Sequence, residues 1–313
     1  MKILITGGAG FIGSNLCDFL LNKGHQLVIV DNLSTGYIKN ISLILDKVDF
    51  YEESIERFNF DRISNVDSII HLAAQPSVPL SISNFSDSSS SNLLGAINVI
   101  DYCRIKKIPL IYASSSAIYG NLLLGDDESS KVDLLSPYAV DKYSMELYAK
   151  TANKLYQLSS VGLRFFNVYG PRQDPNSPYS GVISIFSDRL IKRKPIIVNG
   201  GYQTRDFIYV EDVVKSIYVS LLNAKKNIIC EQVNILTGNP ISIDSLLSIL
   251  MKQMNCYVNK IYHDLPDSDP KQSNGSSRKM VNFLNLNLTE LTQLDKGLKQ
   301  TISFIKGAEI EFK

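Results

Sequence analysis

Short apolar runs alternate with helical patterns along the first half of the chain. Runs rich in Val, Ile, Leu and aromatic residues predict strands at Lys2–Thr6, Leu27–Asp31, Val48–Tyr51, Ser68–Leu72, Leu110–Ala113 and Ser160–Phe165. The first five lack alternation of apolar and polar positions, as is typical of parallel strands covered on both faces. Helical patterns predict helices at Phe11–Asn22, Ile38–Leu45, Ser88–Lys106 and Tyr138–Leu155. This order predicts an α/β fold with a doubly wound parallel sheet, the Rossmann arrangement.

The pattern loosens after residue 170. A polar loop at Arg172–Gly181 precedes predicted helices at Val182–Lys192, Glu211–Leu222, Ile243–Met254 and Leu288–Ile305, and short strands at Ile196–Val198 and Gln232–Ile235. Pro266–Ser277 is polar and irregular. We therefore expect a Rossmann domain over 1–170, to which some later segments return, and a smaller C-terminal α/β domain over 171–313.

Composition excludes several classes of protein. The 313 residues carry a net charge of +1, and 44% are hydrophobic. This balance excludes a disordered chain, and without a basic excess we expect no nucleic-acid partner. No apolar run approaches the ~18 residues of a membrane span. The four cysteines are far apart and form no C-x-x-C, and the glycine-broken start does not resemble a secretory signal, so we expect free thiols, no metal site and a cytoplasmic location.

A glycine-rich turn directly follows the first predicted strand. Gly7, Gly10 and Gly13 form G-x-x-G-x-x-G at the start of a helix, where backbone N–H groups can approach a pyrophosphate. Asp31 closes the second strand. A carboxylate there can accept both ribose hydroxyls of NAD and would repel the 2′-phosphate of NADP. The sequence therefore predicts an NAD site.

The candidate chemical site combines a helix with the end of a strand. Tyr138 and Lys142 are four residues apart, so they share one helix face. An ammonium near a phenol lowers the phenol's pKa, and this would make Tyr138 a usable base. Ser114, Ser115 and Ser116 follow the fifth strand, at the edge where parallel sheets bind ligands.

These motifs together resemble a known family. TGGAGFIGS, HLAAQ, YASSSAIYG, SPYAVDKYSMELYA, GLRFFNVYGPRQDP and RDFIYVEDV are similar, in order, to the extended short-chain dehydrogenase/reductases, within their nucleotide-sugar epimerase/dehydratase branch. The resemblance implies catalysis by Ser115, Tyr138 and Lys142. It further implies NAD contacts from Gly7, Gly10, Phe11, Ile12, Gly13, Asp31, Asn32, Ser34, Leu72, Ala73, Ala74, Tyr138 and Lys142.

The resemblance also bears on the reaction. Related dehydratases carry an Asp-Glu pair after the catalytic Ser or Thr, and related decarboxylases carry a Glu at the position of Ala117. Here Ser116 and Ala117 follow Ser115, so elimination and decarboxylation lose their usual acid and base. A 4-epimerase needs neither. The implied reaction removes a hydride from carbon 4 of the sugar with NAD and returns it to the other face of the 4-keto sugar.

Substrate contacts follow from the same resemblance. It implies that a UDP-sugar is bound by Ser77, Ser115, Ser116, Asn167, Gln173, Arg205, Lys271 and Ser273. A small gate residue, Ser273, favours UDP-N-acetylglucosamine and UDP-N-acetylgalactosamine, since a Tyr there leaves room only for glucose and galactose. Pro266 stands where the family has a second phosphate-binding Arg, and Lys271 is the candidate to compensate.

Alternatives to this function remain open. They are a UDP-glucose/UDP-galactose 4-epimerase, a UDP-N-acetylhexosaminuronate 4-epimerase and a non-catalytic NAD-binding regulator. Helices Ser88–Lys106 and Tyr138–Leu155 carry apolar residues beyond one stripe, and in similar enzymes these helices pair with a symmetry mate, so we expect a homodimer. Burial within a monomer would explain the same residues: Leu93, Ile97, Ile100, Tyr143, Leu147 and Tyr148.

Overall fold

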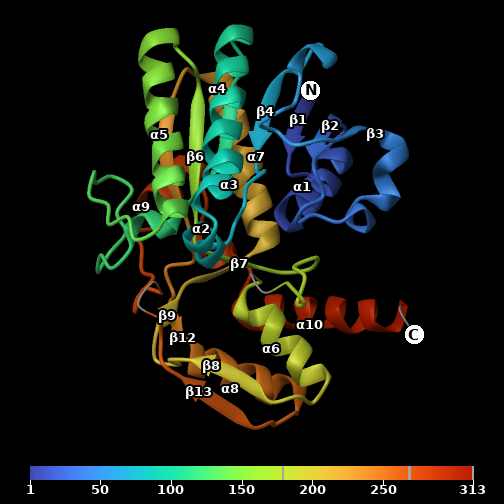
Figure 1. Cartoon of the computed structure of the whole chain (residues 1–313), viewed down its shortest axis with the longest axis vertical. Coiled ribbons are helices and arrows are strands. Elements are labelled where there is room, and N and C mark those ends of the chain that lie inside the picture. Colours follow the sequence, from blue (N-terminus) through green and yellow to red (C-terminus); the bar gives the residue numbers. More distant parts are fainter. Residues whose placement is uncertain (178–179, 267–268, 312–313) are drawn as a thin grey trace. The chain divides into compact units, whose positions relative to one another are not determined.

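The computed structural model describes residues 1–177, 180–266 and 269–311, and its chain divides into two compact units (Figure 1). The first unit comprises Met1–Ile118, Leu134–Arg164 and Val214–Val233. The second comprises Tyr119–Asp133, Phe165–Val213 and Asn234–Lys313. Parts of two predicted loops, residues 178–179 and 267–268, lie outside the described residues.

A seven-stranded sheet forms the centre of the first unit. Its strands lie in the order β11 (Cys230–Ile235), β6 (Ser160–Phe165), β5 (Leu110–Ser115), β4 (Ser68–His71), β1 (Lys2–Thr6), β2 (Gln26–Asp31), β3 (Val48–Glu52). β1 pairs in parallel with β2 and β4, and parallel pairing continues from β2 to β3 and from β4 to β5. The strand order reverses beside β1, where such sheets bind ligands outside the carboxyl ends of the strands. The predicted doubly wound fold is confirmed.

Helices cover both faces of this sheet. α4 (Gly95–Lys106) and α5 (Pro137–Tyr156) lie side by side over one face, where Val99 and Met145 pack with Leu4 of β1 (Figure 1). α1 (Phe11–Asn22) and α7 (Val210–Lys226) meet through the rings of Phe19 and Tyr218, whose centroids are 5.5 Å apart. Because successive strand residues point to opposite faces, both faces need apolar side chains. This is why the strands show no alternation in the sequence.

Two predicted helices of the first unit need correction. Ile38–Leu45 is not an α-helix but two 3-10 turns, η1 (Ile38–Asn40) and η2 (Ser42–Lys47). Its inward residues, Ile41 and Ile44, are three apart, which is the period of a 3-10 turn, and Leu43 is 84% exposed.

The predicted helix at Ser88–Lys106 is a composite. It begins with α3 (Phe85–Ser89), continues through a π-helical segment, η4 (Ser90–Leu94), and ends as α4. α2 (Val78–Ser83) precedes it. The short turns η3 (Phe60–Arg62) and η5 (Ser116–Tyr119) complete the first half of the chain. A π segment inside a helix frequently marks a functional site.

The second unit is built from helices and short strand pairs. α6 (Val182–Ile191) packs against α8 (Ile243–Met254) and α10 (Leu294–Glu311). The strand pairs are β7 (Asn167–Tyr169) with β10 (Phe207–Tyr209), β9 (Thr204–Arg205) with β12 (Ile241–Ser242), and β8 (Ile196–Asn199) with β13 (Lys260–His263).

Predictions for this unit were partly right. The helix at Ile243–Met254 is confirmed over its full length, whereas Leu288–Ile305 divides into a turn, η6 (Leu288–Glu290), and α10. α9 (Arg278–Leu284) and β13 were not predicted. All four residues of β13 are exposed, so no apolar pattern marks that strand. None of the described helices is both long and apolar enough to cross a membrane.

Candidate active site

The turn between β1 and α1 has the form that a dinucleotide pyrophosphate requires. Gly7 has φ +73°, and a Cβ on it would lie 2.7 Å from the backbone nitrogen of Ala73. A Cβ on Gly13 would lie 2.0 Å from the carbonyl oxygen of Gly7. Phe11 and Ile12 are the first residues of α1, directly after the turn. The N-cap residue of α1, Gly10, has an extended backbone. These residues therefore fit NAD, because the backbone can come close to phosphate oxygens at a helix N-terminus.

Asp31 ends β2 beside this turn. Its Oδ2 accepts the N–H of Ala9 (2.9 Å) and its Oδ1 accepts the N–H of Leu33 (2.9 Å). Burial raises the pKa of Asp31, and the hydrogen bonds from backbone amides oppose that rise. Asn32 and Ser34 follow on the surface, where Asn32 Oδ1 accepts the N–H of Ser34 (3.1 Å). The carboxylate is thus held beside the glycine turn, and its contact with the ribose remains a prediction.

The end of β4 is fixed against β1 through Thr6. Thr6 Oγ1 accepts the N–H of Ala73 (3.1 Å) and is hydrogen-bonded to His71 Nδ1 (2.7 Å). The N–H of Leu72 donates to the carbonyl of Thr6 (3.1 Å), and Ala74 continues this partly exposed loop. The predicted cofactor residues at 72–74 therefore border the glycine turn. Thr6, which holds them, was not predicted.

The three predicted catalytic residues meet within the first unit. Ser136 caps α5 by accepting the N–H of Ala139 (3.2 Å), and Pro137 starts the helix, so Tyr138 lies in its first turn. Lys142 is buried, and its Nζ donates to the carbonyl of Ala113 on β5 (2.8 Å). Its Nζ lies 5.7 Å from the centre of the Tyr138 ring.

Burial acts on the electrostatics of both Tyr138 and Lys142. Burial raises the pKa of Tyr138 above 10, and the hydrogen bond from Ser115 opposes this rise. Burial lowers the pKa of Lys142 to about 8. Desolvation therefore disfavours the charged forms of both side chains, and a lowering of the Tyr138 pKa by Lys142 remains a prediction.

The remaining first-unit candidates have structural partners. Ser77 is buried and caps α2 by accepting the N–H of Leu80 (3.1 Å). Ser116 begins η5 after β5, next to Ser115, whose Oγ accepts the N–H of Ala117 (3.1 Å). Ser81, on α2, accepts the N–H of Tyr138 (3.2 Å). α2 is thereby tied to the first turn of α5.

Two buried polar groups behind the site were not predicted. Asn92, in the π segment, accepts the N–H of Gln75 (2.8 Å) and donates to its carbonyl (3.2 Å). Glu146 pairs with Arg164 through Oε1–Nε (2.9 Å) and Oε2–Nη2 (2.7 Å), and Ser114 Oγ donates to Glu146 Oε1 (2.6 Å). Glu146 lies four residues beyond Lys142 on α5, and that i,i+4 spacing is the sequence signal that could have indicated it.

Arg205 and Asn167 lie close in the backbone of the second unit. Arg205 is 8% exposed, its Nη1 donates to the carbonyl of Thr204 (2.7 Å), and its Nη2 pairs with the carboxylate of Asp269. The N–H of Asn167 donates to the carbonyl of Asp206 (3.0 Å). Asp206, the residue after Arg205, therefore links the backbones of these two predicted substrate residues.

Asp206 anchors that link. Its fully buried carboxylate accepts the N–H groups of Thr237 (2.7 Å), Gly238 (2.7 Å) and Asn239 (3.1 Å). Burial raises the pKa of Asp206, and these hydrogen bonds oppose the rise. Asp206 thus fixes the backbone beside Arg205, although it was not among the predicted residues.

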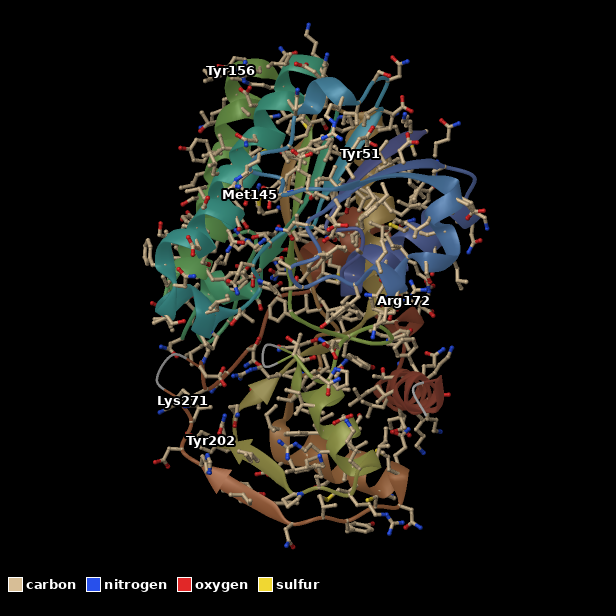
Figure 2. The ribbon with its side chains drawn as sticks, turned by 45° about the vertical axis from the view of Figure 1, so that its right-hand side comes forward. Tyr51, Met145, Tyr156, Arg172, Tyr202 and Lys271 are labelled. Carbon is tan, nitrogen blue, oxygen red and sulfur yellow. The ribbon has the colours of Figure 1, made fainter. Side chains whose placement is uncertain are left out.

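Lys271 and Ser273 flank the same strand. The N–H of Thr204 donates to the carbonyl of Lys271, and the N–H of Ser273 donates to the carbonyl of Thr204, both at 3.1 Å. The side chain of Lys271 is exposed at an edge of the second unit, as Figure 2 shows. The structure therefore brings Lys271 and Ser273 to the backbone of Thr204–Arg205.

Gln173 is already engaged inside the loop after β7. Its Oε1 accepts from Ser184 Oγ of α6 (2.8 Å), and its Nε2 donates to the carbonyl of Val168 (3.3 Å). These bonds fasten the loop to α6. Across the described ranges, no group of three or more His, Cys, Asp or Glu side chains is placed to hold a metal ion.

Comparison with known proteins identifies the family. The model of the NAD dependent epimerase/dehydratase family matches residues 3–235. A putative UDP-glucose 4-epimerase of Methanocaldococcus jannaschii is 41% identical over 267 residues, covering 83% of this chain and 85% of that protein.

Solved structures agree in fold. The UDP-N-acetylglucosamine 4-epimerase of Methanobrevibacter ruminantium M1, in complex with UDP-N-acetylmuramic acid, has a TM-score of 0.91 at 30% identity, covering 98% of each chain. The UDP-glucuronic acid 4-epimerase of Bacillus cereus, in complex with UDP-glucuronic acid and NAD, has a TM-score of 0.90 at 32% identity, covering 98% of this chain and 100% of that one. The predicted cofactor, NAD, and the predicted enzyme class, an isomerase, are confirmed. The chain belongs to the NAD dependent epimerase/dehydratase family.

Proposed function

We propose that this enzyme interconverts UDP-N-acetylglucosamine and UDP-N-acetylgalactosamine. Its similarity to 4-epimerases of UDP-sugars supports the reaction class. The similar proteins differ in the sugar that their names give: glucose, N-acetylglucosamine and glucuronic acid. The choice among these sugars therefore rests on residues of this chain.

Tyr138 and Ser115 handle the proton of the sugar 4-hydroxyl in the proposed reaction. When bound, NAD supplies a hydride acceptor and a positive charge. Tyr138 accepts the proton of the sugar 4-hydroxyl, and Ser115 is hydrogen-bonded to the same oxygen. Positive charge from Lys142 and from the cofactor opposes the effect of burial, which raises the pKa of Tyr138. Return of the same proton restores the enzyme.

Arg205 and Asn167 bind the diphosphate of the substrate in this proposal. A guanidinium presents a fork of donors that fits phosphate oxygens, and Arg205 already binds a carboxylate, that of Asp269. Lys271 adds a nearby charge as a flexible point donor, where Pro266 offers no donor. The substrate must therefore compete with Asp269 for the guanidinium.

The choice of sugar rests on Ser273, which has a small side chain and a backbone that is hydrogen-bonded to Thr204. Its backbone is hydrogen-bonded to Thr204, directly before Arg205, so a residue at 273 has little freedom to move away. A small side chain leaves space for the 2-N-acetyl group, and Ser77 and Gln173 are the further candidates for sugar contacts. A large side chain at 273 would remove that space.

The experiment compares UDP-N-acetylglucosamine, UDP-glucose and UDP-glucuronic acid as separate substrates, with the 4-epimers resolved by proton NMR. We expect the N-acetylated sugar to react fastest. Ser273→Tyr should slow it about tenfold or more relative to UDP-glucose, because overpacking excludes the larger sugar. Ser273→Ala, the matched control, should keep the wild-type preference.

Other outcomes would identify another function. Faster conversion of UDP-glucose or UDP-glucuronic acid would replace the proposed substrate. UDP-N-acetylhexosaminuronate is tested in the same way. If none reacts after NAD is added, while NAD binding is retained, the chain is a non-catalytic NAD-binding protein.

We also propose that the enzyme is a homodimer, joined through α4 and α5. Leu147 and Tyr148 are 45% and 47% exposed, and Leu155 and Tyr156 are 66% and 50% exposed. Figure 2 shows Tyr156 at one end of α5. Ile100, in contrast, is 5% exposed within the core, so monomer burial explains that residue. Exposed apolar residues of this kind along α5, which packs beside α4, fit a two-fold interface.

We further place the enzyme in the cytoplasm. None of the four cysteines, all of which the structure describes, forms a disulfide, as is common where thiols are kept reduced. Thiol titration of protein purified without reductant and then unfolded should give four thiols per chain. Fewer thiols would indicate disulfides and an oxidising location.

A further inference from the structure

The segment directly after Ser273 is paired with a loop that lies far away in the sequence but belongs to the same unit. Gly125 and Gly275 form a parallel β-bridge. In this bridge the N–H of Gly125 donates to the carbonyl of Asn274 (2.8 Å), and the N–H of Ser276 donates to the carbonyl of Gly125 (2.9 Å). The backbone is therefore fixed immediately beyond Ser273.

Two buried aromatic rings require glycine on both sides of this bridge. A Cβ on Gly125 would lie 2.4 Å from Cδ2 of Tyr119, and a Cβ on Gly275 would lie 2.4 Å from Cζ of Phe166. The two rings are themselves neighbours, with centroids 6.3 Å apart. Because both backbones lie directly against buried rings, residues 274–276 have little room to shift toward them.

The side chain of Asn234 joins the two sides of the bridge. Asn234 is fully buried, and its Nδ2 donates to the carbonyls of Gly125 (3.0 Å) and Ser276 (3.1 Å). Its Oδ1 accepts from the hydroxyl of Tyr119 (2.7 Å), and its backbone N–H donates to Asp127 Oδ2 (2.7 Å). A side-chain amide has two N–H donors, and here each side of the bridge receives a bond from the same nitrogen.

Ser273 is thus held on both sides along the chain. Its own N–H donates to the carbonyl of Thr204 (3.1 Å), and the carbonyl of the next residue, Asn274, accepts from Gly125. A side chain at position 273 can exclude a larger sugar only if its backbone cannot move away. The bonds that hold residues 274–276 therefore bear on selectivity as directly as the size of residue 273 does.

We propose that Asn234 is a positioning residue for substrate selectivity, which fixes the backbone at Ser273 by holding the Gly125–Gly275 bridge. This rests on the proposed function, in which Ser273 leaves space for the 2-N-acetyl group. Asn234 acts through the backbone and makes no contact with the sugar in this proposal. Selectivity then depends on three things together: a small residue at 273, the bridge and the buried amide.

The test asks whether loosening the bridge lets a large residue at 273 move aside. Its readout is the ratio of kcat/KM for UDP-N-acetylglucosamine to that for UDP-glucose, which Ser273→Tyr should lower. In the Ser273→Tyr background, adding Tyr119→Phe should raise the ratio about threefold, because one hydrogen bond to Asn234 is lost. Adding Asn234→Leu should raise it about fivefold or more, because all the side-chain bonds are lost.

The matched control is Tyr262→Phe in the same background. It also removes a tyrosine hydroxyl in the second unit, one that donates to Asp244 Oδ1 (2.8 Å) and not to Asn234. This variant should leave the ratio unchanged.

Hydrogen exchange followed by mass spectrometry tests the bridge without any substrate. In Tyr119→Phe and Asn234→Leu, peptides covering 119–127 and 270–277 should exchange about threefold or more faster, while peptides from α8 keep their wild-type rates. Tyr262→Phe should leave the peptides of the bridge unchanged.

The two measurements separate this proposal from the proposed function. Faster exchange together with recovery of the ratio supports the proposal. Unchanged exchange, or faster exchange without recovery, overturns it. An unchanged ratio in Ser273→Tyr alone is a failure of the proposed function, and it overturns the selectivity role of Asn234 even where exchange is faster. If Asn234→Leu does not fold, Tyr119→Phe, which lacks a single hydroxyl, decides between these outcomes by itself.

Discussion

His71 is a buried base whose protonation is excluded by the fold. It is 2% exposed, and burial, followed by the charge of Lys142, lowers its pKa to about 3. In the unfolded chain a histidine titrates near 6.5. Between these two pH values the unfolded state binds one more proton than the folded state. His71 therefore makes the protein less stable as pH falls below 6.5, and has no such effect above it.

The low pKa of His71 should therefore give a measurable slope in the free energy of unfolding against pH. The His71 contribution to the free energy of unfolding should fall by about 1.4 kcal/mol per pH unit below 6.5. His71→Asn, which keeps a polar group for Thr6, should remove that slope between pH 6.5 and 4.5 in urea unfolding followed by circular dichroism. His263→Asn, at an exposed position, is the control. Parallel slopes for the wild type and His71→Asn would mean that His71 is protonated in the folded protein.

At the scale of elements, α5 is held by charge as well as by packing. Glu146 and Arg164 are 0% and 3% exposed, and Ser114 of β5 adds a third bond. α5 is thus joined to two neighbouring strands at the same level of the sheet. Ser114 immediately precedes Ser115, so this junction also fixes the place of a proposed catalytic hydroxyl.

Breaking the buried Glu146–Arg164 pair should destabilise the folded protein. Glu146→Gln leaves the Arg164 charge buried, and we expect the free energy of unfolding to fall by about 3–5 kcal/mol. The control is Glu53→Gln, which breaks an exposed pair with Arg62 and should cost about 1 kcal/mol or less. Urea unfolding measures both. Equal losses in the two variants would contradict a buried charge at Arg164.

What the sequence could predict at this scale depended on burial. The strands of the main sheet and α1 were found because apolar residues mark them, and the glycine turn and Y-x-x-x-K mark two of the candidate sites. The exposed strand β13 has no such mark, and the π segment shifts the helical period without a recognisable residue. Asp206 and Asn234 were missed because a single polar residue looks the same on a surface as in a core.

At the scale of the whole molecule, the proposed homodimer can be tested with one substitution on α5. Wild-type protein should show twice the 34.9 kDa of one chain in light scattering coupled to size exclusion. Leu147→Glu should give 34.9 kDa, since a charge in an apolar interface must be desolvated. Leu43→Glu, on an exposed turn away from α5, is the control. A monomeric wild type, or a Leu147→Glu variant that remains dimeric, would contradict the proposed interface.

The interleaving of the two units along the chain has a consequence for biosynthesis. β11, the outermost strand beside β6, is made only after the stretch Phe165–Val213 of the second unit. At ordinary rates of synthesis, several seconds pass between the end of β6 and the end of β11. During this interval the nascent sheet has an unpaired edge at β6, which is a site for misassociation. A ribosome that pauses between residues 165 and 229 would prolong the exposure of this edge, so codon choice in this stretch should influence the yield of folded enzyme.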